Sequence, residues 1–295
     1  MTAWIFARSI SRPVQERLRR PPGAQFGARV LAVFEDVCDL VTQDCDVVAL
    51  VLPRIGDGPL NIVLDGAQGL FAGVRPGAPV TLEGTRLRID GVGVDLGKAT
   101  VWEPRPDWEV LQSRRAAIVA HLPLLRSLCL RHAPDDSLFS LLGTPLPDDG
   151  HAGTILSTAR EATEALKEGW AGHSERLHEG VAKLAGLGSG LTPAGDDFLA
   201  GVMLWAWLVH PTPVPFCQAI AKVAVPRTTI LSAAFLRTAA RGESGVPWHV
   251  LLEALGDAST NKQAANILAA LQEILACGAT SGADSLAGFL CCPSL

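Results

Sequence analysis

Short apolar runs separated by turn residues fill the first third of the chain. Residues 28–35 and 46–52 are rich in β-branched side chains, and glycine, proline and aspartate pairs separate such runs. Short strands at this close spacing are typical of a small β-barrel or sandwich. The sequence also predicts a hairpin over residues 85–95 that turns at Asp90-Gly91. The expected strands are residues 28–35, 46–52, 61–64, 79–82, 86–89 and 92–96.

The hydrophobic period changes after the proline-containing segment at residues 103–108, which is the best candidate for a linker. Beyond it, apolar residues recur at helical spacing, and Pro123 is expected to kink or restart the first helix. Strands followed by helices predict an α+β protein, with a small β-barrel or sandwich domain over residues 1–105 and an α-helical domain over residues 106–295. The expected helices are residues 110–130, 154–166, 175–185, 198–209, 217–223, 229–240, 248–255 and 261–277.

Composition narrows the possible classes of function. The 295 residues are 48% hydrophobic and 19% charged, which is enough to bury a sizeable core. A net charge of −5 and the absence of tyrosine argue against a nucleic-acid partner. The apolar run at residues 198–209 is too short to span a membrane, so no membrane partner is expected. The seven cysteines lack zinc-ligand spacing, and we expect a cytoplasmic protein with reduced thiols.

One loop, residues 186–197, concentrates the candidate chemistry. It has the sequence GLGSGLTPAGDD and lies between two expected helices, the second beginning at Asp196 or Asp197. Ordering glycine costs about 0.5–1 kcal/mol more than ordering alanine, so the loop needs positive φ angles or a ligand against its backbone to offset that cost. Amides of glycines and of a helix N-terminus together favour an anion.

A second segment repeats this pattern. The sequence G-x-D-x-L-A-G occurs at residues 195–201 and again at residues 282–288, which makes Asp197 and Asp284 equivalent. In each copy a turn with threonine and glycine precedes a helix that has an aspartate in its first turn. We expect the two helix N-termini to face each other across one site.

The roles of the polar residues stay open in the sequence. The acids repel an anion, so they either cap the helices, accept hydrogen bonds from an amide of the ligand, or share Mg²⁺ with a phosphate. Between the copies, Thr228 is expected to cap a further helix, or to face the site with Arg227 as an anion clamp. The histidines are isolated and no Gly-x-Ser-x-Gly elbow is present, so neither a metal-ligand set nor a serine nucleophile is predicted.

Residues 186–201, with the sequence GLGSGLTPAGDDFLAG, and two supporting segments resemble the signature of the AllH family. The supporting segments are residues 228–232 and 278–284, and the β-rich first third, ending near residues 99–104, is also similar. The chain departs from the family pattern at Ser189, where the family has proline. The resemblance implies a subunit of an oxamate carbamoyltransferase-like enzyme in ureide and purine catabolism. That enzyme converts oxalurate and phosphate to oxamate and carbamoyl phosphate.

We therefore predict one ligand site, with Asp196, Asp197 and Asp284 as the catalytic acids that orient an amide or hold Mg²⁺, the one possible cofactor. The expected ligand is a small anionic metabolite such as phosphate, oxamate or carbamoyl phosphate, and other subunits of a hetero-oligomer are expected partners. The alternative is a non-catalytic module that assembles such a complex or senses its metabolite. The expected ligand-binding residues are Gly188, Ser189, Gly190, Thr192, Gly195, Arg227, Thr228, Thr229, Ser232, Thr280, Ser281 and Gly282.

Overall fold

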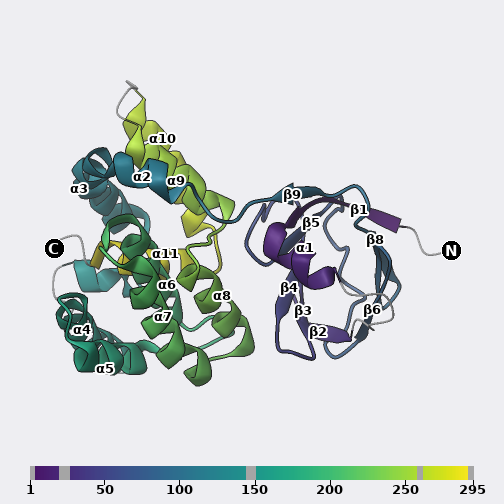
Figure 1. Cartoon of the computed structure of the whole chain (residues 1–295), viewed down its shortest axis with the longest axis horizontal. Coiled ribbons are helices and arrows are strands. Elements are labelled where there is room, and N and C mark those ends of the chain that lie inside the picture. Colours follow the sequence, from purple (N-terminus) through teal and green to yellow (C-terminus); the bar gives the residue numbers. More distant parts are fainter. Residues whose placement is uncertain (1–3, 20–26, 144–150, 258–261, 292–295) are drawn as a thin grey trace. The chain divides into compact units, whose positions relative to one another are not determined.

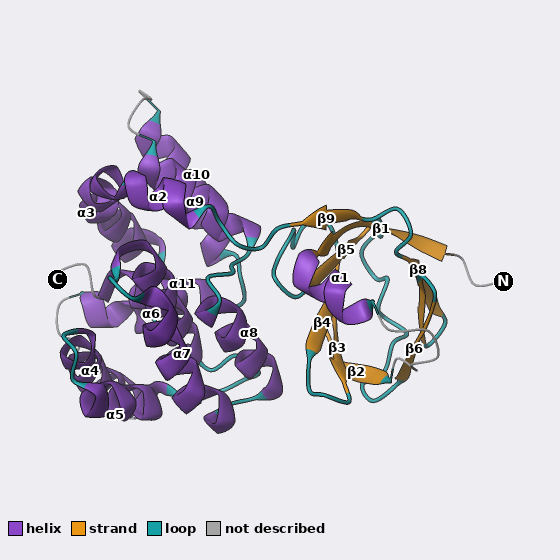
Figure 2. Ribbon diagram, in the orientation of Figure 1, coloured by secondary structure: helices purple, strands orange, loops and turns teal. Residues whose placement is uncertain are grey.

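The computed structural model describes residues 4–19, 27–143, 151–257 and 262–291. The chain divides into two compact units, Met1–Pro104 with Ser244–Val246 and Arg105–Glu243 with Pro247–Leu295. The strands lie in the first unit and nearly all of the helices in the second (Figures 1 and 2). The predicted α+β class is confirmed. No helix in the described ranges combines the length and the apolarity needed to cross a membrane.

The first unit is a closed β-barrel. Strands pair around the ring β1-β5-β4-β3-β2-β6-β7-β8, and β8 pairs back onto β1. The last strand, β9, pairs parallel with the end of β1, where Ser9 lies opposite Thr100. Of the two predicted architectures, the structure has the barrel. The strands in the described residues are β1 Trp4–Ser11, β2 Ala28–Val33, β3 Val37–Thr42, β4 Val47–Val51, β5 Asn61–Leu64, β6 Pro79–Glu83, β7 Arg86–Ile89, β8 Val92–Asp95 and β9 Thr100–Trp102.

The interior of the barrel is filled by every second side chain of its strands. Leu40, Leu50, Ile62 and Leu87 are fully buried in one cluster, because side chains along a strand point alternately to the two faces. The short helix α1, Arg12–Leu18, adds Val14 to this cluster. Removal of this apolar surface from water stabilises the unit.

The predicted hairpin is confirmed. Strands β7 and β8 pair antiparallel with Ile89 opposite Val92, so Asp90 and Gly91 form the turn. Their φ angles are 40° and 89°. Positive φ at both central residues is the requirement of a type I′ turn, and the Asp-Gly sequence satisfies it.

The sequence does not predict β1, β3 or β9. In β1 an arginine and two serines interrupt the apolar pattern, so the hydrophobic pattern does not reveal the strand. Strand β3 has Asp39 at its centre, although this side chain is only 3% exposed. Burial raises the pKa of Asp39 to about 7. Because this acid interrupts a short apolar run, the hydrophobic pattern of the sequence does not predict the strand.

The second unit is helical, and α6, Ala194–Val209, is its central helix. Helix α10 is shorter than the predicted segment 261–277, whose first residue lies outside the described residues. The other helices in the described residues are α2 Trp108–Ser113, α3 Arg115–His132, α4 His151–Trp170, α5 Ser174–Leu184, α7 Pro213–Ala224, α8 Ile230–Ala240, α9 Val246–Gly256, α10 Gln263–Leu275 and α11 Ser281–Cys291, with the 3-10 helices η1 Leu138–Leu142 and η2 Val225–Arg227.

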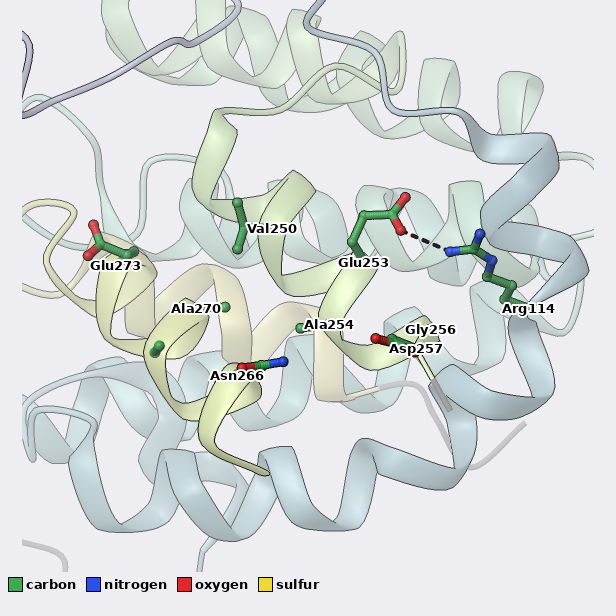
Figure 3. A pocket seen from close by; sticks show the side chains of 10 residues that line it. Arg114, Val250, Glu253, Ala254, Gly256, Asp257, Asn266, Ala270 and Glu273 are labelled. Carbon is green, nitrogen blue, oxygen red and sulfur yellow. Dashed lines mark hydrogen bonds and ion pairs between the residues drawn. The ribbon is translucent and has the colours of Figure 1, made fainter. Parts of the chain in front are cut away.

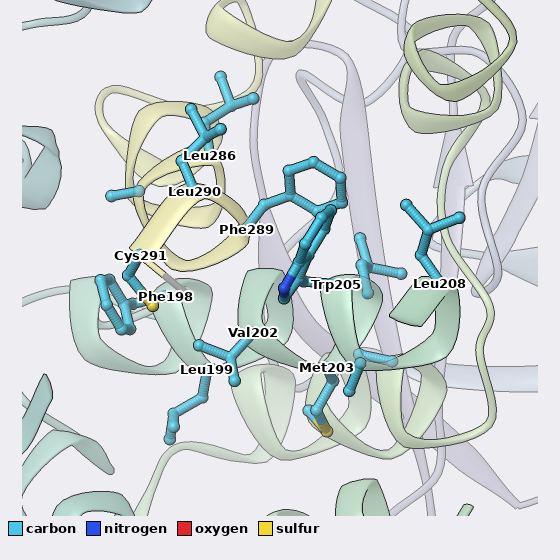
Figure 4. Packing of buried hydrophobic residues seen from close by; sticks show 14 of the residues in the cluster. Phe198, Leu199, Val202, Met203, Trp205, Leu208, Leu286, Phe289, Leu290 and Cys291 are labelled. Atoms are coloured by element: carbon cyan, nitrogen blue, oxygen red, sulfur yellow. The ribbon is translucent and has the colours of Figure 1, made fainter. Parts of the chain in front are cut away.

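Helices α6 and α11 form the centre of the helical core (Figure 4). Almost every α6 side chain from Phe198 to Leu208 is buried, as expected of a helix that is apolar on all sides. Phe289 of α11 meets Trp205 of α6 edge to face, with 5.2 Å between the ring centroids. The two helices that carry the repeated motif therefore pack directly on each other.

Helices α6 and α3 differ from the prediction. Helix α6 begins at Ala194 with Pro193 as its N-cap, so Asp196 and Asp197 lie inside its first turn. Helix α3 continues through Pro123, and the predicted helix is instead interrupted at Arg114, between α2 and α3. A proline inside a helix removes one backbone hydrogen bond, and the buried apolar face of α3 offsets that loss.

Candidate functional site

Three segments that are distant in sequence are linked at the N-terminal ends of α6 and α11. They are the loop at residues 186–193, the turn at residues 227–229 and the turn at residues 277–280. Thr192 Oγ1 lies 3.1 Å from Ser281 Oγ, which joins the first segment to the start of α11. The structure thus brings together the regions that the sequence singled out.

Asp196 anchors the loop at residues 186–193 to the start of α8. Its Oδ1 accepts the Gly186 N–H at 3.0 Å, and its Oδ2 accepts from Ser232 Oγ at 2.8 Å and from the Thr228 hydroxyl. The side chain is only 1% exposed, and a buried carboxylate needs such donors to offset the loss of water. These bonds occupy both oxygens, so we assign Asp196 to holding the loop in place.

The segment before α8 differs from the prediction in one respect. Thr229, not Thr228, is the N-cap of α8, and its Oγ1 accepts the Ser232 N–H at 3.1 Å. The cap moves by one residue because the Thr228 hydroxyl donates to a buried carboxylate instead. Arg227 is exposed, and its Nη1 donates to the Val223 carbonyl at 2.6 Å. The guanidinium thus binds the C-terminal end of α7.

Gly188, Ser189 and Gly190 form the exposed tip of the first loop. Gly188 and Gly190 have φ angles of 113° and 93°, a region that residues with a side chain rarely adopt. Just after the tip, the Leu191 carbonyl accepts the Thr229 hydroxyl. Backbone conformation therefore accounts for these two glycines, and the tip lies at the surface where a ligand can reach it.

Gly195 and Gly282 each allow a close approach to the preceding helix. A Cβ on Gly195 would lie 2.1 Å from the Leu184 carbonyl oxygen of α5, and one on Gly282 would lie 1.9 Å from the Ile274 carbonyl oxygen of α10. Both distances are far below any real contact, so only glycine fits. Each copy of the motif is therefore a packed helix pair, α5 with α6 and α10 with α11.

Helices α6 and α11 cross at the last glycine of each motif. A Cβ on Gly201 would lie 1.8 Å from the Ser285 carbonyl oxygen, and one on Gly288 would lie 1.9 Å from the Phe198 carbonyl oxygen. Ser285 and Phe198 occupy equivalent positions in the two copies. Each glycine thus meets the same position of the other copy, which relates the two helices by an approximate two-fold axis.

The equivalent acids Asp197 and Asp284 are both shielded from water, and the charge of Asp284 acts on Asp197. Burial raises the pKa of Asp197 well above its ordinary value, a hydrogen bond from Ser281 opposes this rise, and the charge of Asp284 adds to it. Burial also raises the pKa of Asp284, to about 6, and the charge of Asp136 adds to the rise. The Leu138 N–H, which donates to Oδ1 at 2.6 Å, and the Thr280 hydroxyl oppose it. Each acid keeps one buried oxygen, Oδ2, that has no hydrogen-bond partner among the described residues.

Two contributors to this site are not in the predicted set. Leu138 of η1 supplies a backbone N–H to the second acid, and nothing in the sequence of η1 indicates a distant partner. Cys277 lies in the turn before α11, where burial raises the pKa of its thiol and the charges of Glu273 and Asp197 add to the rise. A raised pKa favours the unreactive thiol over the thiolate.

Within the described ranges, no three His, Cys, Asp or Glu side chains gather in a way that would hold a metal ion.

A separate groove of about 710 Å³ lies in the helical unit (Figure 3). The Arg114 guanidinium in this groove pairs with Glu253 at 2.9 Å. With that cation paired, the remaining charged groups are acidic, so the groove suits an anionic metabolite less well than the loops do. Its lining residues are Arg114, Val250, Glu253, Ala254, Gly256, Asp257, Asn266, Ala269, Ala270 and Glu273.

Each of the two units contains a segment that matches a known family. Residues 184–293 match the family described as oxamate carbamoyltransferase subunit AllH, a span that begins at the end of α5 and includes both copies of the motif. Residues 6–101, which form the barrel, match the AllH family N-terminal domain. No solved structure matches the chain. The resemblance seen in the sequence is confirmed, and the chain belongs to the AllH family.

Proposed function

We propose that this chain is a subunit of an oxamate carbamoyltransferase-type enzyme and binds a small anionic, amide-containing metabolite at the N-terminal ends of α6 and α11. The enzyme would act in ureide and purine catabolism, converting oxalurate and phosphate to oxamate and carbamoyl phosphate. The description of the matching family supports the subunit role and implies partner subunits. We place the protein in the cytoplasm, where buried thiols such as Cys38 and Cys129 stay reduced.

The observation that carries the proposal is the contact between Thr192 and Ser281 beside the acid pair Asp197 and Asp284. It brings hydroxyls, glycine amides and carboxylates of both motif copies to one place. Oxalurate, oxamate and carbamoyl phosphate each combine an anionic group with an amide or carbamoyl group. Hydroxyls and amides suit the anionic end, and carboxylates suit the N–H donors of the other end.

Such a site can support carbamoyl transfer without a covalent intermediate on the protein. Phosphate must be held against the carbamoyl carbon of oxalurate, and the negative charge that develops on the carbonyl oxygen must be stabilised. Fixed hydroxyl and amide donors perform both tasks, since positioning and electrostatic stabilisation supply much of the rate enhancement in group transfer.

Calorimetric titration of the full chain with phosphate, oxamate and carbamoyl phosphate tests the site. The titration is repeated with and without Mg²⁺, and with the partner subunits added. We expect all three ligands to bind the wild type, Asp197→Ala to bind oxamate and carbamoyl phosphate only weakly, and the surface variant Glu164→Gln to bind all three like the wild type. Unaltered binding of oxamate and carbamoyl phosphate by an Asp197→Ala variant that unfolds at the wild-type temperature rejects this site.

Phosphorolysis of oxalurate by the reconstituted complex tests the enzyme role. We expect turnover that needs this chain and is lost with Asp197→Ala. If the other subunits catalyse the reaction equally well without this chain, it is instead an assembly or metabolite-sensing module.

A further inference from the structure

Two buried carboxylate oxygens in the helical unit lack a hydrogen bond. They are Oδ2 of Asp197 and Oδ2 of Asp284, at equivalent positions of the repeated motif. An unsatisfied buried acceptor costs about 1–3 kcal/mol, and more when it is charged. Asp196, in the same turn of α6, has donors on both of its oxygens, so the fold satisfies a neighbouring buried acid and leaves these two unsatisfied.

The other oxygen of Asp284 is already engaged. Asp284 Oδ1 accepts the Leu138 N–H at 2.6 Å. The Ser281 hydroxyl acts on Asp197 and opposes the rise that burial causes in the pKa of this acid. The backbone donor fixes the Asp284 carboxylate, and Oδ2 of each acid stays without a partner among the described residues.

The hydroxyls beside the pair lie nearer the surface than the carboxylates. Thr192, Thr280 and Ser281 are partly exposed, whereas Asp284 is completely buried. A ligand that enters from the surface therefore meets the hydroxyls first and the carboxylates last.

We propose that Oδ2 of Asp197 and Oδ2 of Asp284 together receive the unsubstituted NH2 group of the ligand's carbamoyl or primary amide end. This inference rests on the proposed function, since it assigns one end of the same ligand. An NH2 group has two protons, and the pair offers one acceptor for each. The anionic end of the ligand then points toward Thr192 and Ser281 and away from the carboxylates.

A divalent cation fits the same place less well. Mg²⁺ demands a near-octahedral set of oxygen ligands, and no three acidic, histidine or cysteine side chains of the described residues are grouped so that they could hold a metal ion. The Leu138 N–H and the Ser281 hydroxyl also direct positively polarised hydrogens at these carboxylates. A neutral NH2 group adds two hydrogen bonds without displacing these donors.

Oxamate and N,N-dimethyloxamate are the probes that test the inference. Both are monoanions, and they differ in the N–H donors at one end. Calorimetric titration of the full chain, alone and with its partner subunits, should give at least about tenfold tighter binding of oxamate, because a site built to bond N–H groups rejects an analogue that lacks them.

The variants Asp197→Asn and Asp284→Asn separate hydrogen bonding from size, since Asn and Asp have the same shape. In Asp284→Asn the amide oxygen must accept the Leu138 N–H, so its NH2 group replaces the acceptor that faces the ligand. We expect the preference for oxamate to fall close to one in both variants, with phosphate binding retained. The exposed Asp135→Asn variant should keep the wild-type preference.

A preference that persists in both folded variants overturns the inference while the proposed function stands. A rise in unfolding temperature on adding Mg²⁺ alone, present in the wild type and absent in Asp197→Asn, overturns it in favour of a cation site. If neither phosphate nor oxamate binds the wild type in any assembly, the proposed function itself fails.

Discussion

The two copies of the motif share a backbone plan but divide its tasks differently. In the first copy Asp196 ties the loop to α8 through three donors, and Asp197 beside it keeps a free oxygen. In the second copy Ala283 stands at the position of Asp196, and Asp284 both accepts the Leu138 N–H and keeps a free oxygen. The equivalent acids Asp197 and Asp284 therefore have different surroundings, but each keeps an unpartnered Oδ2.

What the copies share most strictly is the helix crossing, and breaking it should have the largest effect. The Gly288→Ala variant puts a methyl group 1.9 Å from the Phe198 carbonyl oxygen, so the helices must separate. We expect the free energy of unfolding to fall by at least about 3 kcal/mol, measured by urea unfolding with tryptophan fluorescence. Gly143→Ala, where the added Cβ meets only an ordinary 3.5 Å contact, is the matched control. Equal stability of the two variants would refute the crossing.

Removing the anchor of the first copy should have the next largest effect. Asp196→Ala gives the first copy the residue that the second copy has, and it leaves the Gly186 N–H and the hydroxyls of Thr228 and Ser232 without their acceptor. We expect a loss of about 2–3 kcal/mol in the same unfolding assay. A wild-type midpoint would show that the loop does not depend on this acid.

Titration of Asp284 tests the electrostatics of the second copy. Its pKa is raised to about 6 in the folded state, above the value of about 4 expected in the unfolded chain. The folded state therefore binds the proton more tightly, and this acid makes the protein less stable as pH rises from about 4 to 6.

The Asp284→Asn variant should remove this pH dependence. Relative to the wild type, it should gain on the order of 2 kcal/mol of stability between pH 4 and pH 7, measured by thermal unfolding across this range. A constant difference between the two proteins over that range would contradict the raised pKa.

The smallest effect is expected at the contact that joins the copies. Thr192→Val keeps the shape of the side chain and removes the hydroxyl that lies 3.1 Å from Ser281 Oγ. Because both residues are partly exposed, water replaces much of the lost bond, and stability should fall by less than about 1 kcal/mol. Phosphate affinity, measured by titration, should fall several-fold, and an unchanged affinity would separate this contact from the site.

The sequence predicts those features that have a local signal. The period of the strands gave the barrel as one of two options, and Asp90-Gly91 located the hairpin turn. The repeated G-x-D-x-L-A-G predicted that two distant helix starts belong together. Each of these signals is local or is a copy of a local signal, so it can be read without knowing the tertiary contacts.

Features that depend on a distant partner could not be predicted. Asp196 accepts hydrogen bonds from Thr228 and Ser232, which lie 32 and 36 residues further along the chain. The local sequence therefore does not distinguish the role of Asp196 from that of Asp197. The Leu138 donor is a backbone N–H, which any non-proline residue supplies. Asp39 shows the same limit in the barrel, since only the fold makes this acid a buried strand residue.

A double-mutant cycle on oxamate binding tests most directly whether Asp197 and Asp284 act on one ligand. Affinities are measured for the wild type, Asp197→Asn, Asp284→Asn and the double variant by calorimetric titration. If both acids hold the same NH2 group, the effects are not additive, and the coupling energy is at least about 1 kcal/mol. Effects that add to within about 0.5 kcal/mol would contradict a shared site.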